Sequence, residues 1–120
     1  MDAAAIKDIF AAFAQVSVRK MFGGHGVYAD GLCFAIEAFG EIYLKVDAET
    51  ELAFEAAGTK RFTYEMSGKP KSMAYRTMPG EAEDDEEALK RWCGLALAAA
   101  RRADLAKQAK AARGAGRKRR

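Results

Sequence analysis

Apolar residues recur along the first part of the chain with two different periods. Between residues 2 and 15 they are spaced i, i+3, i+4 and i+7, which predicts an amphipathic helix buried on Ile6, Ile9, Phe10 and Phe13. From Val18 onward the spacing approaches two, which is typical of β-strands. The sequence therefore predicts a helix that lies on a sheet.

Strand and turn signals then alternate over residues 18–46. Residues 18–29 predict one strand that is bent at its glycines, and Asp30-Gly31 is a two-residue hairpin signal. Further strands are predicted over residues 32–38 and 41–46, on either side of Phe39-Gly40. In the first of these, Leu32, Phe34 and Ile36 are expected on one face. Three antiparallel strands in a meander are the simplest arrangement.

The second half of the chain repeats this alternation. A short helix is predicted from Asp47 to Gly58, followed by strands over residues 61–66 and 71–78. A long helix is predicted from about Asp84 to Arg102, in which Gly94 indicates a close contact with the sheet; its buried positions are Leu89, Trp92, Cys93, Ala96 and Ala100. The predicted fold class is α+β, an antiparallel sheet with the order α-β-β-β-α-β-β-α and helices packed on it.

The length of 120 residues fits one domain, which we expect over residues 1–102 and followed by a disordered tail over 103–120. The apolar runs are shorter than the roughly 18 residues that a membrane span requires. The N-terminus lacks the basic and then apolar layout of a signal peptide. We therefore expect a cytoplasmic protein that does not contact membranes.

Charge is distributed unevenly along the chain. Residues 1–100 have a net charge of −5, whereas residues 101–120 have a net charge of +8. Two interpretations of the basic tail are open, a solubilising end and a weak, sequence-independent contact with nucleic acid. The residues that would make such a contact are Arg101, Arg102, Lys107, Lys110, Arg113, Arg117, Lys118, Arg119 and Arg120.

The candidate chemistry is sparse. Cys33 and Cys93 are far apart and not part of a CxxC pair, so a zinc or redox site would have to combine them with His25, the only histidine; two small core side chains are the alternative. His25 has no nucleophile or carboxylate near it in sequence, which favours an exposed or locally bonded histidine over a general base. We predict no cofactor, no metal and no catalytic residue.

Glycines cluster in the segment from Gly23 to Gly26, which has two interpretations. A glycine-rich backbone can approach a phosphate closely, but a phosphate loop is followed by a helix and ends in Gly-Lys-Ser/Thr. Neither feature is present here, because β-like residues lie on both sides. The segment therefore favours a strand bend or β-bulge.

Two polar stretches leave a structural and a functional interpretation open. An outward sheet face is predicted that is either solvated or binds a partner, and it consists of Tyr43, Lys45, Arg61, Thr63, Glu65 and Arg76. The acidic run from Glu81 to Glu87 is either the start of a helix or a docking site for a basic partner.

Several blocks of the sequence resemble the N-terminal domain of the TfoX/Sxy competence-regulator family. The resemblance covers Ile6 to Arg101 and is strongest in the blocks RKMFGG and YLKVD. The matching positions, mainly structural in character, are Arg19, Lys20, Met21, Phe22, Gly23, Gly24, Gly26, Tyr28, Gly31, Tyr43, Lys45 and Trp92.

This resemblance implies an α+β fold like that of secretion chaperones, together with a regulatory association with DNA uptake in bacteria. Members of the family are thought to assist a transcription factor of the cyclic-AMP receptor type. We expect a stand-alone, non-enzymatic regulatory domain that acts through protein contacts, with weak nonspecific nucleic-acid contact by the tail. The alternative is a homo-oligomeric, chaperone-like interaction module, such as a homodimer, without a nucleic-acid role.

Overall fold

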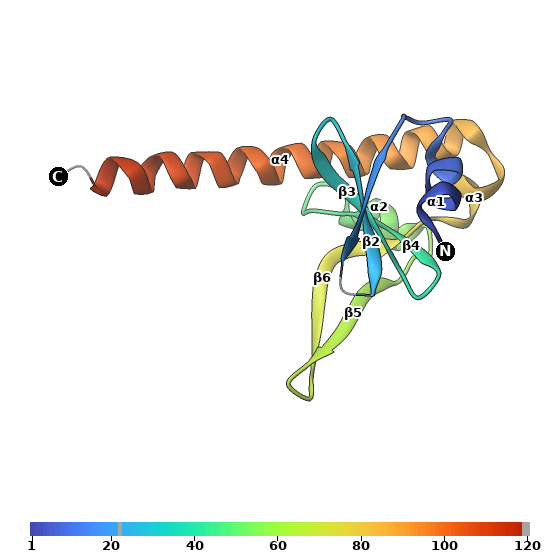
Figure 1. The fold of residues 1–120 in the computed structure, drawn as a ribbon, viewed down its shortest axis with the longest axis horizontal. Coiled ribbons are helices and arrows are strands. Elements are labelled where there is room, and N and C mark those ends of the chain that lie inside the picture. Colours follow the sequence, from blue (N-terminus) through green and yellow to red (C-terminus); the bar gives the residue numbers. More distant parts are fainter. Residues whose placement is uncertain (22, 119–120) are drawn as a thin grey trace.

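The computed structural model describes residues 1–21 and 23–118 of the chain. In chain order the elements are α1 (Ala3–Phe10), β1 (Ser17–Met21), β2 (Gly24–Ala29), β3 (Leu32–Ala38), β4 (Glu41–Lys45), α2 (Glu51–Ala56), β5 (Arg61–Met66), β6 (Lys69–Thr77), α3 (Gly80–Asp84) and α4 (Glu86–Lys118). The strands form one antiparallel sheet in the order β1-β2-β3-β4-β6-β5 (Figure 1). The α+β class and the broad order of helices and strands match the prediction.

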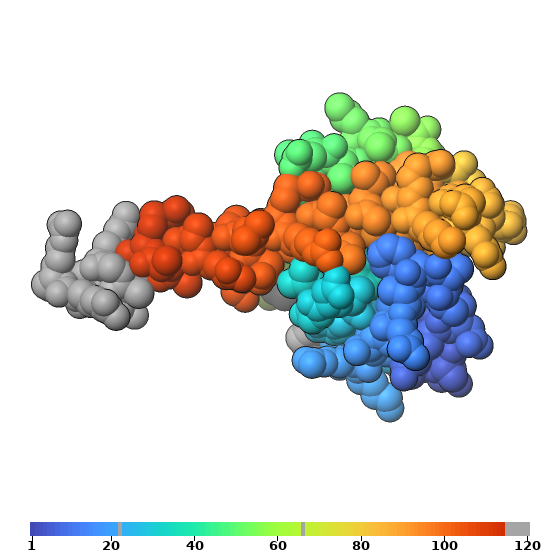
Figure 2. All heavy atoms as spheres, turned by 90° about the horizontal axis from the view of Figure 1, so that it is seen from above, coloured from blue at the N-terminus to red at the C-terminus, as the bar shows by residue number. Residues whose placement is uncertain are grey.

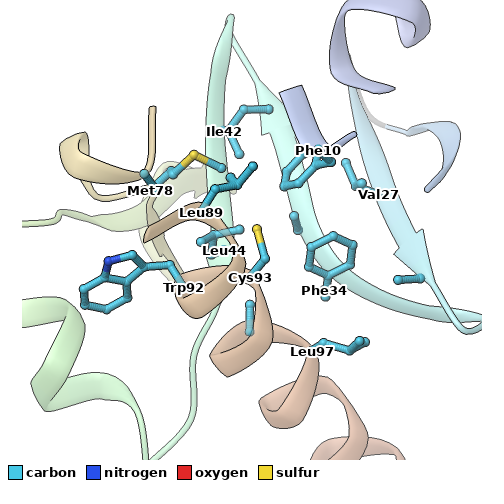
Figure 3. Close-up of a cluster of buried hydrophobic side chains, with 14 of the residues drawn as sticks. Phe10, Val27, Phe34, Ile42, Leu44, Met78, Leu89, Trp92, Cys93 and Leu97 are labelled. Atoms are coloured by element: carbon cyan, nitrogen blue, oxygen red, sulfur yellow. The ribbon is translucent and has the colours of Figure 1, made fainter. Parts of the chain in front are cut away.

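The main core lies between one face of the sheet and the helices. Phe10 of α1 packs edge-on against Phe34 of β3, with ring centroids 5.3 Å apart, and Trp92 of α4 packs in the same way on Phe54 of α2 at 4.7 Å. Cys93 is fully buried between these groups (Figure 3). Aromatic rings at both ends of this core thus fix α1, α2 and α4 on the sheet.

Three hairpin turns place two consecutive residues at positive φ, as a two-residue turn that matches the strand twist requires. These pairs are Asp30-Gly31, Phe39-Gly40 and Ser67-Gly68. The first of them was predicted as a hairpin, and the structure confirms it.

The predicted single bent strand over residues 18–29 is wrong. The chain reverses at Gly23, whose φ is +77°, and β1 and β2 form an antiparallel hairpin in which Arg19 faces Gly26. The sheet consequently gains a sixth strand. The turn could not be predicted because closely spaced glycines, such as Gly23, Gly24 and Gly26, occur both at bends within a strand and at turns between two strands.

A β-bulge in β3 corrects a second detail. Val27 pairs with Ala35 but Tyr28 pairs with Cys33, so Phe34 is an extra residue in its strand. Phe34 lies in the main core, whereas Ile36 belongs to a separate cluster on the other face. Leu32, Phe34 and Ile36 were predicted on one face, and the bulge moves Ile36 to the opposite one.

Helix α4 extends far beyond its predicted end near Arg102. It continues to Lys118, about four turns further, where a disordered tail was expected (Figure 1). Residues 103–113 contain only Ala, Leu, Lys, Arg, Gln and Asp, most of them strong helix formers, and Gln108 donates a 2.7 Å hydrogen bond to Asp104. Phe22, Arg119 and Arg120, which are among the predicted site residues, lie outside the described residues.

Candidate interaction surfaces

The sheet face opposite the helices, called the open face below, gathers six of the predicted motif residues. Its hydrophobic cluster consists of strand residues alone, with Ile36, Phe62 and Tyr75 at its centre. The strand register places on this face the motif residues Arg19, Met21, Gly26, Tyr28, Tyr43 and Lys45. Residues that are scattered in sequence therefore share one surface.

Aromatic rings and cations alternate on the open face. The guanidinium of Arg19 lies 4.9 Å from the Tyr28 ring centroid, and the ammonium of Lys45 lies 5.0 Å from that of Tyr75. Tyr43 meets Phe62 edge-on at 4.8 Å. Burial raises the pKa of both Tyr43 and Tyr75 above the ordinary tyrosine value of 10.0. The half-buried rings of Tyr28 and Tyr43, beside the two cations, can contact flat or apolar groups next to anionic ones.

The predicted outward sheet face does not stay together. Tyr43 and Lys45 lie on the open face, but Arg76 lies on the helix side, where its Nε is 3.1 Å from Oε2 of Glu51 in α2. Arg61 also pairs with Glu51. Thr63 and Glu65 are exposed on β5. The open face itself is not simply solvated, because its central side chains Phe62 and Tyr75 are only 9% and 7% exposed.

The glycines of the motif permit close packing of strands and rings. A side chain at Gly24 would collide with the backbone carbonyl of Glu37, and one at Gly26 would come 2.9 Å from Sδ of Met21. Gly23 forms the β1–β2 turn, so the segment leads into a strand and not into a helix N-terminus. The geometry therefore does not support a phosphate loop.

His25 has a carboxylate partner that sequence spacing did not reveal. Its Nδ1 lies 2.6 Å from Oε1 of Glu37 on the neighbouring strand, and Oε2 of Glu37 accepts a 2.9 Å hydrogen bond from the backbone N–H of Gly40. Glu37 is only 5% exposed. Burial alone would raise the pKa of this carboxyl, but the bonds from His25 and Gly40 hold it below its usual value. Of the two predicted alternatives, exposed or locally bonded, His25 is thus the locally bonded one, and it ties two strands together.

Trp92 is the motif residue that anchors helix α4. Its Nε1 donates a 2.6 Å hydrogen bond to Oε1 of Glu81, which also pairs with Arg91. The indole therefore joins α2, through Phe54, to α3 and α4.

Two of the predicted tail contacts are engaged within the domain. Nε of Arg102 lies 2.6 Å from both Oδ2 of Asp47 and Oε2 of Glu49, and Arg101 pairs with Asp30. The Arg102 hydrogen bonds hold the pKa of Asp47 below its usual value. These pairs clamp α4 to the body at the point where the helix leaves it.

Beyond this clamp, α4 stands clear of the body (Figure 2). We call residues 103–114 the projecting end. Lys107, Lys110 and Arg113 are exposed there at i, i+3 and i+6, which places them along one side of the helix. Arg117 and Lys118 continue the same helix.

A family model of the TfoX N-terminal domain matches residues 8–100. The chain belongs to the TfoX N-terminal domain family. A comparison with curated proteins finds no match. The matched range ends at Ala100, so the projecting end lies outside the part of this TfoX N-terminal domain that the family model covers.

Neither the cysteines nor the acidic side chains of this TfoX N-terminal domain assemble a metal site in the described residues. No three His, Cys, Asp or Glu side chains come together there in a suitable group. Cys33 lies against Tyr75 on the open face, while Cys93 lies in the main core, where burial raises its pKa to about 12. None of the helices in residues 1–21 and 23–118 combines the length and hydropathy needed to cross a membrane.

The TfoX N-terminal domain has a cleft on the side of α1 and α3, called the acidic cleft below. It has a volume of about 800 Å³ and lies between α1, the β3–β4 turn and the α3–α4 junction. Apolar side chains, among them Ile9, Ile42 and Leu89, form part of its lining, and Phe39, 92% exposed, stands at the β3–β4 turn. Its carboxylates are Asp8, Glu41, Glu83, Asp84, Asp85 and Glu86, and its lining contains no Lys, Arg or His.

Proposed function

We propose that this TfoX N-terminal domain is a non-enzymatic regulatory domain that acts in the cytoplasm through protein contacts, assisted by nonspecific contact between nucleic acid and the projecting end. The observation that carries the nucleic-acid part is the row formed by Lys107, Lys110 and Arg113. This row is exposed on a helix that has already left the body.

Such a row suits phosphates and does not suit base recognition. Cations that neutralise phosphates release condensed counterions, so the affinity falls steeply with salt and depends little on sequence. Base recognition requires side chains placed in a groove with defined geometry. The Arg102 clamp sets the direction of the projecting end but does not use its three cations.

Duplex DNA binding over a salt titration tests this part. We compare the full chain with the triple variant Lys107→Ala, Lys110→Ala and Arg113→Ala. If all three cations contact phosphates, the slope of log K against log salt becomes shallower by about 2.7, or roughly 0.9 for each lost contact. Fluorescence anisotropy at several salt concentrations measures the slope.

Lys69→Ala with Lys71→Ala is the matched control, because both lysines are exposed in the β5–β6 hairpin, away from α4. This control should keep the slope of the full chain. Equal slopes for the full chain and the triple variant would remove the projecting end from the proposal.

We assign the protein contacts to the open face. Its aromatic rings and the cations Arg19 and Lys45 have the composition of protein interfaces, in which aromatic residues and Arg are enriched. The family resemblance suggests a transcription factor of the cyclic-AMP receptor type as the partner. Calorimetric titration of such a factor with Arg19→Glu/Lys45→Glu should show at least about tenfold weaker binding than with the full chain.

The exposed pair Lys69→Glu/Lys71→Glu makes the same change in net charge away from the open face and should bind like the full chain. Unchanged binding by Arg19→Glu/Lys45→Glu would show that the open face is not the contact surface. A homo-oligomeric module is the second candidate function, because the acidic cleft is complementary in charge to the projecting end.

A further inference from the structure

The acidic cleft and the projecting end lie at opposite ends of the molecule. The cleft is formed around α1 and α3, next to the N-terminus, while α4 runs past the sheet to the other extreme (Figure 1). The molecule measures 55 × 35 × 30 Å along its principal axes. Since α4 is one continuous helix from Glu86 to Lys118, a chain cannot place its projecting end in its own cleft.

The two features match in charge. The cleft presents six carboxylates and no basic side chain, whereas the projecting end presents Lys107, Lys110 and Arg113. Asp8 stands on the α1 wall and Glu83 on the α3 wall, so carboxylates border the cleft on two sides. A basic helix laid between these walls would meet carboxylates on both flanks.

The two features also match in polarity. Next to the cation row, the projecting end carries a stripe of Leu105, Ala109 and Ala112 at i, i+4 and i+7, and Leu105 is 63% exposed. The cleft offers the half-buried Ile9 and the exposed ring of Phe39 to such an apolar stripe. The small alanines allow the helix to approach the cleft closely.

We propose that the projecting end of one copy docks in the acidic cleft of a second copy. A copy that has docked only its end still has a free cleft, and its partner still has a free end. Association therefore continues into chains or closes into a ring, the smallest of which is a reciprocal dimer. Salt weakens it, because exposed charges are screened over about 8 Å at 0.15 M ionic strength.

Docking uses the same three cations as the proposed nucleic-acid contact, so the two states exclude each other. DNA should therefore dissolve the assemblies, and assembly should reduce DNA binding. The docking does not depend on the proposed function, because it needs only the cleft and the projecting end.

Two complementary variants test the docking. Lys107→Glu/Lys110→Glu/Arg113→Glu has an intact cleft but a reversed end, and Asp8→Lys/Glu83→Lys has an intact end but a reversed cleft. In low salt, the wild-type chain should form dimers or larger species, and each variant alone should associate at least about tenfold more weakly. Sedimentation velocity over a concentration series measures this.

The mixture of the two variants is the decisive sample. The intact end of one variant and the intact cleft of the other allow a single contact, so the mixture should form a 1:1 heterodimer and stop there. Lys69→Glu/Lys71→Glu, which also reverses exposed positive charges but away from the projecting end and the cleft, should assemble like the wild type. A wild-type chain that stays monomeric in low salt, or a mixture that stays monomeric, would overturn the docking.

The cleft variant also separates this inference from the proposed function. Asp8 and Glu83 are exposed and cap neither of their helices, and a lysine at position 8 lies near the C-terminus of α1, where positive charge favours the helix, so the variant should fold. It keeps all three cations and should still bind DNA. Asp8→Asn/Glu83→Gln removes the two negative charges without adding positive ones, and it should weaken association without any change in circular dichroism. Unchanged association in this variant would count against the docking.

Discussion

One buried carboxylate, Glu37, holds His25 on the adjacent strand and the backbone of the next turn at the same time. Its Oε1 lies 2.6 Å from Nδ1 of His25, and its Oε2 accepts the N–H of Gly40. The His25 bond therefore crosses from β2 to β3, and the Gly40 bond fixes the β3–β4 turn. Glu37 thus links β2, β3 and the β3–β4 turn at this end of the sheet.

Glu37 should make the stability of the domain depend on pH in the acid range. The pKa of its carboxyl is lower in the folded chain than its ordinary value of 4.5, so its contribution is present above about pH 4.5. The contribution is lost as the pH falls through the folded pKa. We expect Glu37→Gln to lower the free energy of unfolding by about 1–3 kcal/mol at pH 7, and by less at pH 3.5. Urea denaturation at both pH values measures the difference.

Glu65→Gln is the matched control, because Glu65 is exposed on β5, and it should leave stability unchanged within about 0.5 kcal/mol. A deficit of the same size at both pH values for Glu37→Gln would contradict the role given to the ionised carboxylate.

The His25–Glu37 pair shows where sequence reasoning stops. A locally bonded histidine could be inferred because no nucleophile lies nearby, but the identity of its partner depends on strand register. The register of β2 and β3 depends in turn on the bulge at Phe34, which places Glu37 opposite His25. The missed turn at Gly23 hides the pairing of Lys20 with His25.

Two glycines should respond in opposite directions to replacement by alanine. A Cβ at Gly24 collides with the carbonyl of Glu37, and the backbone has no rotamer with which to escape. Gly94 was expected to mark a close contact with the sheet, but a Cβ there meets nothing within 4 Å. We expect Gly24→Ala to destabilise the domain by about 1–3 kcal/mol and Gly94→Ala to stabilise it by up to about 1 kcal/mol.

Thermal unfolding of both variants checks the pair. A stabilising Gly24→Ala would mean that β2 and β3 can move apart at no cost. A destabilising Gly94→Ala would restore the predicted contact between α4 and the sheet.

At Trp92, the contribution of the hydrogen bond to Glu81 can be measured separately from the contribution of ring packing on Phe54. Trp92→Phe keeps a ring beside Phe54 but removes the donor to Glu81, so we expect a loss of about 1–3 kcal/mol. Glu81→Gln keeps an acceptor for the indole and should cost less. Chemical denaturation compares them, and equal losses would place the effect in the charge of Glu81 and not in the indole bond.

The composition of the open face could be foreseen only in part. Period-two alternation correctly placed Tyr43 opposite Ile42, but the bulge at Phe34 moved Ile36 to the side of Tyr43. Ion pairing then drew Arg76 toward α2. Alternation within one strand is a local property, whereas bulges and partners on other elements are set by the whole fold.

The end of α4 should be dispensable for folding, while its clamp should not be. Truncation after Ala106 removes an exposed stretch of helix and keeps the Arg102 pairs with Asp47 and Glu49, so the free energy of unfolding should change by less than about 0.5 kcal/mol.

Arg102→Ala in the full chain should lower the melting temperature at pH 7. Because Arg102 holds the pKa of Asp47 below its ordinary 3.8, the clamp contributes above that pH, and the effect of Arg102→Ala should shrink in stronger acid. Thermal melts at pH 7 and pH 3 test both statements, and a truncation as damaging as Arg102→Ala would show that residues 107–118 pack on the body.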